Sequence, residues 1–268
     1  MITPVETGTP DMLAHVDGHV GWMTYRNPAR LNAVSQEMQE AIPRILAQFS
    51  ATPELRVVVV RGDGDRAFVS GADIAEFADK RTSVEARAAY DGAVMAVSTA
   101  YAHFEWPVVA MVRGYCLGFG LLAAVQADIR ISADDGQFGI PAARLGLGYQ
   151  YWGVELLAGL VGPAYAAEIL FSGRRLSADE ALRIGLVNRV VPAAELETTV
   201  CELADAIAGN APLTVKAAKA AVSAFRRGPS AQDLAAIDAL VEACYRSDDY
   251  REGQRAFAEK REPRFEGR

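Results

Sequence analysis

The chain has 268 residues, of which 34 are acidic and 27 are basic, so its formal net charge is −7. Hydrophobic residues make up 51% of the chain, which is typical of a globular protein and excludes a chain that is disordered throughout. The negative charge disfavours nucleic acid as a partner, because phosphate binding depends on basic surface. We find no apolar run of about 20 residues and no signal-peptide pattern at the N-terminus, so we expect a cytoplasmic protein without membrane contact.

The three cysteines predict neither a disulfide framework nor a metal site. Cys116, Cys201 and Cys244 are far apart in the sequence, and none belongs to a C-x-x-C pair. A structural zinc site needs paired ligands at short spacing, and a disulfide framework usually has an even number of cysteines. We therefore expect no metal.

A β-hairpin and a helix are the first elements that the sequence predicts. Two apolar stretches within residues 12–25 flank Asp17-Gly18, a dipeptide that favours a tight hairpin turn. Ser35 then precedes apolar residues at helical spacing, and serine is a preferred N-cap. The chain therefore begins with a hairpin followed by an amphipathic helix.

The middle of the chain alternates between strands and helices. Residues 57–60, 107–112 and 128–133 are predicted strands, and the first two are continuous apolar runs, which are typical of strands covered on both faces. Residues 84–103 and 117–127 are predicted helices. Alternation of this kind indicates parallel strands joined by crossover helices, so the predicted fold class is α/β.

The second half of the chain is predicted to be mostly helical. Breaks are expected at Gly173, at Pro192, at 209–212 and at 228–229, and a short apolar stretch lies at 186–191. The last segment, 231–261, is charged and amphipathic. We divide the chain into a core, residues 1–200, and a C-terminal helical region, residues 201–268.

Two glycine-containing segments follow predicted strands and are candidates for a binding site. They are residues 67–74 and 114–120, and each precedes a predicted helix. In open α/β sheets, ligands bind at the carboxyl ends of the strands. Two free backbone amides that converge there would form an oxyanion hole, which can stabilise the enolate of a thioester. The alternative is that each glycine only makes an ordinary turn.

Taken together and in order, the motifs of this chain resemble the enoyl-CoA hydratase/isomerase (crotonase) family. The resemblance covers the chain from about Val16 to its C-terminus. The motifs are NPARLNA (27–33), AFVSGADI (67–74), PVVAMVRGYCLG (107–118), ADIR (127–130), FGIP (138–141), GRRLSADEA (173–181), GLV (185–187) and EGQRAFAEKR (252–261).

The resemblance implies a spiral of ββα units with a C-terminal helical region that mediates trimerisation, as a homotrimer or a dimer of trimers. It implies an acyl-CoA substrate of fatty-acid metabolism, with coenzyme A as part of the substrate and no tightly bound cofactor. The thioester oxygen would lie between the amides of Ala72 and Phe119. The positions implied to contact coenzyme A are Arg30, Arg66, Ala67, Gly71, Ala72, Phe257 and Lys260, with Phe257 and Lys260 coming from a neighbouring subunit. A solvent-exposed cation is the alternative reading of Arg66 and Lys260, and interface packing that of Phe257.

The two glutamates that hydratases of the family use are replaced in this chain. Counting from Gly118 places the first at Leu122, and counting from FGIP places the second at Ala142. Neither side chain can transfer a proton, so the family resemblance does not by itself establish hydratase activity.

Tyr149 is the remaining side-chain candidate for catalysis. It matches a pocket tyrosine of the methylmalonyl-CoA decarboxylase branch, which the chain partly resembles, although that branch has histidine where this chain has Ala72. Decarboxylation of a malonyl-type thioester needs no carboxylate base, because loss of CO₂ itself produces the enolate. The alternative is that Tyr149 only packs as an aromatic wall.

Two other functions stay open at this point. Glu155 is a candidate catalytic acid or base that has moved from the family positions, which would allow a hydratase or an isomerase; its alternative role is electrostatic, in the first turn of a helix. A non-catalytic acyl-CoA binder would also keep the amides and lack the acids.

Overall fold

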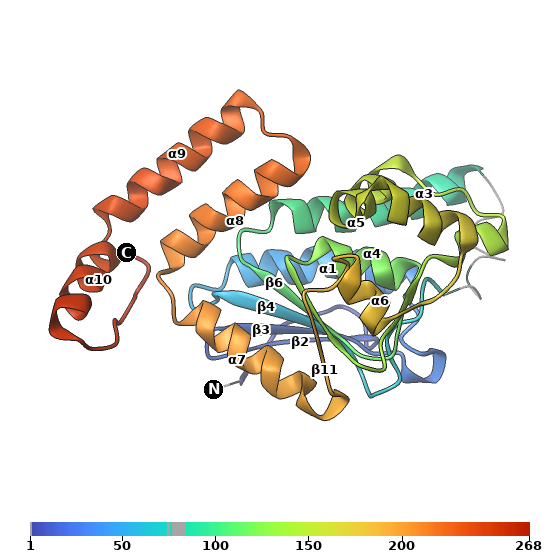
Figure 1. Cartoon of the computed structure of the whole chain (residues 1–268), viewed down its shortest axis with the longest axis horizontal. Coiled ribbons are helices and arrows are strands. Elements are labelled where there is room, and N and C mark those ends of the chain that lie inside the picture. The colour runs from blue at the N-terminus through green and yellow to red at the C-terminus, as the bar shows by residue number, and fades with distance from the viewer. Residues whose placement is uncertain (1, 74–75, 77–83) are drawn as a thin grey trace.

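The main sheet runs through the centre of the molecule (Figure 1). The computed structural model describes residues 2–73, 76 and 84–268, and within them the main sheet has seven strands in the order β1-β2-β3-β4-β6-β8-β11. From β3 to β11 all neighbouring strands are parallel, whereas β1, β2 and β3 pair antiparallel. The bounds are β1 Ile2–Pro4, β2 Met12–Asp17, β3 Val20–Tyr25, β4 Val57–Gly62, β6 Val108–Val112, β8 Ile129–Ala133 and β11 Arg189–Val191. The predicted α/β class, the hairpin and the buried strands are confirmed.

The central strands are apolar on both sides because helices cover both faces of the sheet. In β4, Val58 and Val60 belong to the core under α1 (Gln36–Ser50) and α3 (Val84–His103). Val57 and Val59 belong to a second core under α7 (Leu196–Ala208). Side chains alternate between the faces of a strand, so a run of four valines serves both layers.

A smaller sheet lies beside the main one, and the sequence did not predict it. Its order, within the described residues, is β10-β9-β7-β5. The strands are β5 Ala67–Val69, β7 Tyr115–Leu117, β9 Gln137–Gly139 and β10 Leu176–Ser177. Each has only two or three residues, too few to show a period of two.

The two sheets are linked by a repeated ββα unit. β4, β5 and α3 form one unit; β6, β7 and α4 (Phe119–Gln126) form the next; β8, β9 and α5 (Tyr151–Ser172) form the third. In each unit the first strand joins the main sheet and the second joins the small one. This arrangement is the predicted spiral, and it brings the ends of β5 and β7 together.

The predicted helices form with small changes at their ends. Ser35 caps α1, since its hydroxyl accepts a hydrogen bond from the amide of Met38 at 3.2 Å. The predicted helix 84–103 is α3, whereas the predicted helix 117–127 starts two residues later because β7 occupies residues up to Leu117. In the part of the chain that the structure describes, three short 3₁₀ helices connect other elements at Pro28–Arg30, Pro141–Leu145 and Ala193–Glu195.

The sequence was expected to contain no apolar run of about 20 residues, and helix α5 corrects this expectation. Within the described residues it is the one helix whose length and composition are sufficient to cross a membrane. The backbone of Gly162, with φ 77° and ψ 160°, is not helical and divides α5 into two parts ahead of Pro163. Each part has about 10 residues and rises about 15 Å, which is half of the roughly 30 Å of a hydrocarbon core. Length and composition are therefore weak evidence for a membrane span here.

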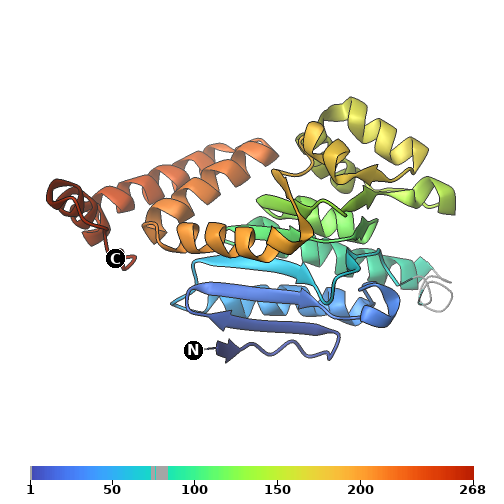
Figure 2. The same ribbon diagram turned by 60° about the horizontal axis from the view of Figure 1, so that its bottom comes forward.

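The C-terminal helices extend away from the sheets at the end opposite α3 and α5 (Figures 1 and 2). After α6 (Ala178–Arg183) and α7, α8 (Pro212–Arg227) contacts the core through Lys219, whose Nζ lies 2.6 Å from Asp128 Oδ1. The predicted segment 231–261 forms two helices, α9 (Ala231–Arg246) and α10 (Asp248–Glu259), because Ser247 caps a new helix. None of the residues of α9, all of which the structure describes, is buried.

Candidate active site

A pocket of about 630 Å³ lies between α3, the start of α4 and the segment that leads into α5. Most of the lining is apolar or glycine. The described residues that line it are Ser70, Gly71, Ala72, Tyr90, Asp91, Val94, Gly118, Phe119, Leu122, Ile140, Pro141, Ala142, Leu145, Gly146, Leu147, Gly148, Tyr149, Gln150, Trp152 and Gly153. Four predicted site residues, Gly71, Ala72, Phe119 and Tyr149, are thus brought together.

The backbone around Ala72 directs its amide away from the neighbouring chain. Val34 forms a parallel bridge here: its amide donates to the Gly71 carbonyl at 2.9 Å, and its carbonyl accepts from the Asp73 amide at 2.9 Å. In a parallel bridge these two bonds occupy one side of the strand, so the N–H of the residue between them points to the other side. Within the described residues, the Ala72 amide donates no hydrogen bond. It is available to a ligand in the pocket.

The amide of Phe119 is available for a different reason. Phe119 is the first residue of α4, and the first amides of a helix have no partner within the helix. Gly118 precedes it with φ 52° and ψ −114°, a conformation that residues with a Cβ rarely adopt. The positive end of the helix dipole therefore faces the pocket at this amide.

The two loops touch each other at their glycines. A Cβ built on Gly118 would lie 3.8 Å from the Cα of Gly71, and Gly71 itself has φ +135°. Both glycines come directly before the amides in question, so the conformations that free the amides also bring the loops together. This geometry supports the predicted oxyanion hole of Ala72 and Phe119.

The NPARLNA motif braces the first loop. Asn32 is buried, and its side-chain amide donates to the Ala67 carbonyl at 2.8 Å and to the Asp63 carbonyl at 2.9 Å. Arg30, a predicted coenzyme A contact, forms an ion pair with Asp73, next to Ala72. The motif therefore holds the Ala72 loop in place.

Tyr149 lines the pocket, and its hydroxyl is enclosed within the protein. Its oxygen is buried and has no hydrogen-bond partner among the described residues. Burial, with a smaller contribution from Tyr90, raises the pKa of Tyr149, so the phenol stays protonated at neutral pH. Buried polar groups are nearly always hydrogen-bonded, so this O–H is a candidate donor to a bound molecule.

Tyr149 lies beside Leu122, the first of the two positions predicted to lack a glutamate. A Cβ built on Gly153 would lie 2.8 Å from Cε1 of Tyr149 and 3.6 Å from Cδ1 of Leu122. The second such position, Ala142, lines the same pocket. The ring of Tyr149 is therefore close to the part of the site where the resemblance expects carboxylates.

Replacing Gly153 tests whether the position of the Tyr149 ring matters. Gly153→Ala is expected to lower kcat about tenfold, because its methyl group displaces a ring that has to be aligned with the substrate. The measurement is steady-state kinetics on the substrate found in the assays proposed below. Gly159→Ala on the same helix meets nothing within 4 Å and is the matched control. Equal kcat values for both variants would contradict the prediction.

Two pocket residues on α3 were not predicted from the sequence. Tyr90 and Asp91 line the pocket together with Val94, one turn further along the helix. The carboxylate of Asp91 makes no hydrogen bond or ion pair with any described residue. Helical periodicity predicted α3, but only the packed structure decides which face of an alanine-rich helix meets a pocket.

Similarity to known proteins is extensive. The model of the enoyl-CoA hydratase/isomerase family matches residues 16–268. The chain belongs to this family. It is 33% identical to the short-chain-enoyl-CoA hydratase of Clostridium acetobutylicum over 94% of this chain and 95% of that one. It is 35% identical to the carnitinyl-CoA dehydratase of Salmonella enteritidis, over 89% and 92% of the two chains.

Solved structures of enoyl-CoA hydratases have the same fold. An enoyl-CoA hydratase/carnitine racemase from Magnetospirillum magneticum superposes with a TM-score of 0.90 at 34% identity, over 97% of both chains. An enoyl-CoA hydratase from Bacillus anthracis gives a TM-score of 0.90 at 30% identity, over 96% of this chain and all of that one. The crotonase fold implied by the motifs is confirmed.

Several of the site residues predicted from the sequence are absent from the described pocket lining. Glu155 is exposed on α5 and is absent from the described lining, so the structure does not support it as the relocated acid or base. Ala67 is buried in β5. Arg66 is exposed and its side chain has no partner among the described residues. Ile74, which ends the second motif, lies outside the described residues.

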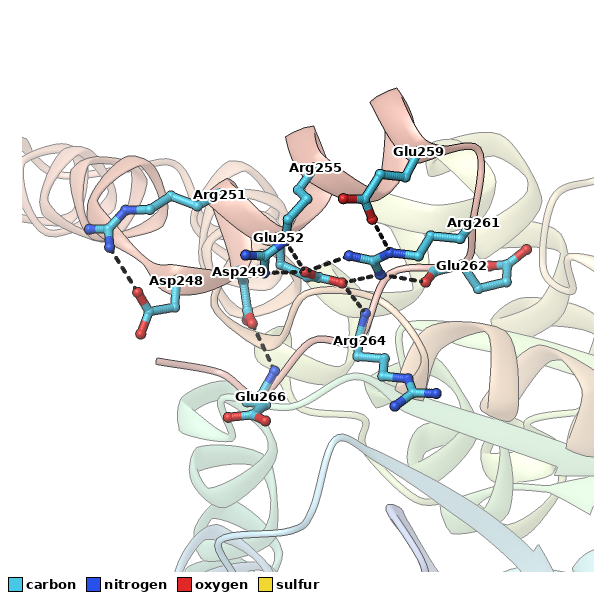
Figure 3. Close-up of polar contacts among 10 residues, drawn as sticks. All are labelled: Asp248, Asp249, Arg251, Glu252, Arg255, Glu259, Arg261, Glu262, Arg264 and Glu266. Carbon is cyan, nitrogen blue, oxygen red and sulfur yellow. Dashed lines mark hydrogen bonds and ion pairs between the residues drawn. The ribbon is translucent and has the colours of Figure 1, made fainter.

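Phe257 lies on α10 and Lys260 is the C-cap of that helix, at the other end of the molecule from α5 (Figure 1). The Phe257 side chain is 88% exposed. The chain after α10 folds back, and Figure 3 shows how carboxylates hold it. Glu252 accepts from Arg261 at 2.6 Å, and Asp249 accepts from the Glu266 amide at 2.7 Å.

The charges at this end form a structural clamp. The Arg261 and Arg255 guanidinium groups and the Arg264 amide lower the pKa of Glu252 well below its ordinary value. Glu252 and Asp249 are both largely buried despite their charge. Both carboxylates bind groups of the C-terminal segment itself, so this cluster fixes the tail. Phe257 remains exposed on the outside of α10.

Proposed function

We propose that this protein is an enzyme that binds an acyl-CoA and forms the enolate of its thioester. The observation that carries the proposal is the pair of unused amides, at Ala72 and Phe119, in one pocket. Two fixed N–H donors stabilise negative charge as it develops on the thioester oxygen, and donors of this kind are often the largest contribution to catalysis.

The proposed reaction is hydration, dehydration or double-bond isomerisation of a neutral acyl group. The relatives named as a hydratase and a dehydratase support this class. The described lining contains no lysine, arginine or histidine, so nothing there would neutralise a second carboxylate on the acyl group. Burying such a charge without a partner is costly. A neutral acyl group fits the pocket better.

Decarboxylation of a malonyl-type thioester is the second candidate, and Tyr149 favours it. In that reaction the bond from the α-carbon to the carboxylate breaks, CO₂ leaves, and the electron pair forms the enolate. The protonated phenol of Tyr149 would then donate a proton to the α-carbon. Leu122 and Ala142 are compatible with this chemistry, because no base is needed.

An acyl-CoA panel distinguishes these reactions from simple binding. The purified protein is incubated with 2-enoyl-, 3-enoyl-, 3-hydroxyacyl- and methylmalonyl-CoA, and products are followed by chromatography and CO₂ release. Turnover of a neutral thioester is the expected result. CO₂ release only from the malonyl-type ester favours the second candidate. Calorimetric binding without any turnover indicates a non-catalytic binder, and no binding at all overturns the proposal.

Replacing Tyr149 further distinguishes the reaction of a neutral thioester from decarboxylation of a malonyl-type thioester. Tyr149→Phe is expected to lower kcat about tenfold on a neutral thioester, which is the effect of losing one hydrogen bond in the transition state. If Tyr149 is the proton donor of a decarboxylase, the loss is about 10²–10⁴-fold instead. Phe keeps the ring that packs over Gly153, so retained thermal stability is the control for folding.

We further propose that the chain forms a homotrimer or a dimer of trimers through its C-terminal helices. α9 has no buried residue in its described span, and Phe225 and Phe257 are more than 80% exposed in the single chain. Apolar surface of this kind is typical of an interface. In such an assembly Phe257 and Lys260 would reach coenzyme A bound to a neighbour. Light scattering that gives the mass of one chain would contradict this.

A further inference from the structure

We infer that Asp91 is the group that moves the proton in this pocket and that the reaction it serves is double-bond isomerisation. The inference rests on the proposed function, since it needs a thioester enolate in the Ala72 and Phe119 amides. It assigns to α3 the role that the family resemblance expects of two glutamates elsewhere.

Asp91 is placed on the face of α3 that meets the pocket. Tyr90 and Val94, on the same face, are each 9% exposed and also line the pocket. Asp91 itself is exposed within this lining and is free of ion pairs and hydrogen bonds to the described residues. A carboxylate that is not engaged in holding the fold together is free to approach a substrate.

No other described residue of the lining can serve as a base at neutral pH. The lining has no second carboxylate and no histidine or lysine. Tyr149 stays protonated because burial raises its pKa, so it can donate but cannot accept a proton. Glu155, the carboxylate expected from the sequence, lies outside. Among the described residues of the lining, Asp91 is therefore the side chain that can act as a base.

One carboxylate is sufficient for isomerisation. Asp91 takes a proton from the α-carbon of a 3-enoyl thioester, and the electrons of that C–H bond form a dienolate whose negative oxygen is held by the two amides. The protonated Asp91 then returns the proton to the γ-carbon, which gives the 2-enoyl thioester. No oxidant or co-reactant enters, and Asp91 ends in its starting state. Because the Asp91 side chain is exposed, the proton that it holds exchanges with solvent, so turnover in D₂O introduces deuterium.

Hydrogen exchange tests the role of Asp91 directly. The protein is incubated with 3-hexenoyl-CoA in D₂O, and deuterium at the α- and γ-carbons is followed by NMR together with formation of 2-hexenoyl-CoA. Asp91→Asn is expected to lower exchange and isomerisation at least about 10²-fold, the usual contribution of a general base, with thioester binding unchanged. Asp91→Glu keeps the carboxylate and is expected to retain measurable exchange.

Glu155→Gln is the matched control, because it neutralises an exposed carboxylate outside the described lining. It is expected to exchange at the wild-type rate. Wild-type exchange in Asp91→Asn would overturn the role of Asp91 and leave the oxyanion hole standing. Thioester binding with neither exchange nor isomerisation in the wild type would overturn the base alone, whereas absence of thioester binding would overturn the proposed function as well.

Discussion

Gly118→Ala is expected to lower kcat about 10²–10³-fold, the effect of losing one donor of an oxyanion hole. Gly118 has φ 52° and ψ −114°, where a Cβ is strongly disfavoured. Relief of that strain rotates the peptide between residues 118 and 119 and turns the Phe119 amide away from the pocket. The measurement is kcat on the thioester that the wild type converts, with KM measured alongside.

The control for this prediction is a glycine with positive φ far from the pocket. Gly18 has φ +57° in the β2–β3 turn and nothing within 4 Å of a built Cβ. Gly18→Ala carries a backbone penalty of about 1 kcal/mol and is expected to keep full activity. If both variants keep wild-type kcat, the Phe119 amide does not hold the thioester oxygen.

Lys219→Ala is expected to lower the free energy of unfolding by about 3–5 kcal/mol, because it leaves a buried carboxylate without its charge partner. Asp128 accepts from Lys219 Nζ at 2.6 and 2.7 Å and from the Val108 amide at 2.8 Å. The two side chains are only 8% and 14% exposed. The pair joins α8 to the start of β8 in the main sheet, so its loss loosens the C-terminal helices from the core.

Urea denaturation followed by circular dichroism measures this effect. Arg246→Ala removes an ion pair with Glu242 whose side chains are 77% and 56% exposed, and it should change stability by less than about 1 kcal/mol. A Lys219→Ala variant as stable as Arg246→Ala would show that the buried pair contributes no more than a surface pair.

The buried strands could be predicted because local pattern and tertiary environment agree. A run such as Val57–Val60 is stable only where apolar groups cover both faces, and the structure supplies α1 and α3 on one side and α7 on the other. Ser35 predicted a helix start for a local reason, since its hydroxyl satisfies a free amide of the first turn.

Part of the candidate site could also be predicted from the sequence. The glycines that follow two predicted strands indicated the two loops, and the family resemblance implied Ala72 and Phe119 within them. Tyr149 was found through a family motif, and the structure places it in the pocket. Glu155 lies outside the described pocket lining, because its motif neighbourhood says nothing about which side of α5 it occupies.

The sequence by itself determined the α/β class, the order of strands and helices, and the two loops that carry the amides. These depend on interactions within a few residues, such as periodicity, caps and glycine turns. The tertiary structure alone decided that short strands such as β5 and β7 pair in a second sheet, that Gly162 divides α5, and that Asp91 shares a pocket with Tyr149. These depend on contacts between segments far apart in the chain, which no local pattern specifies.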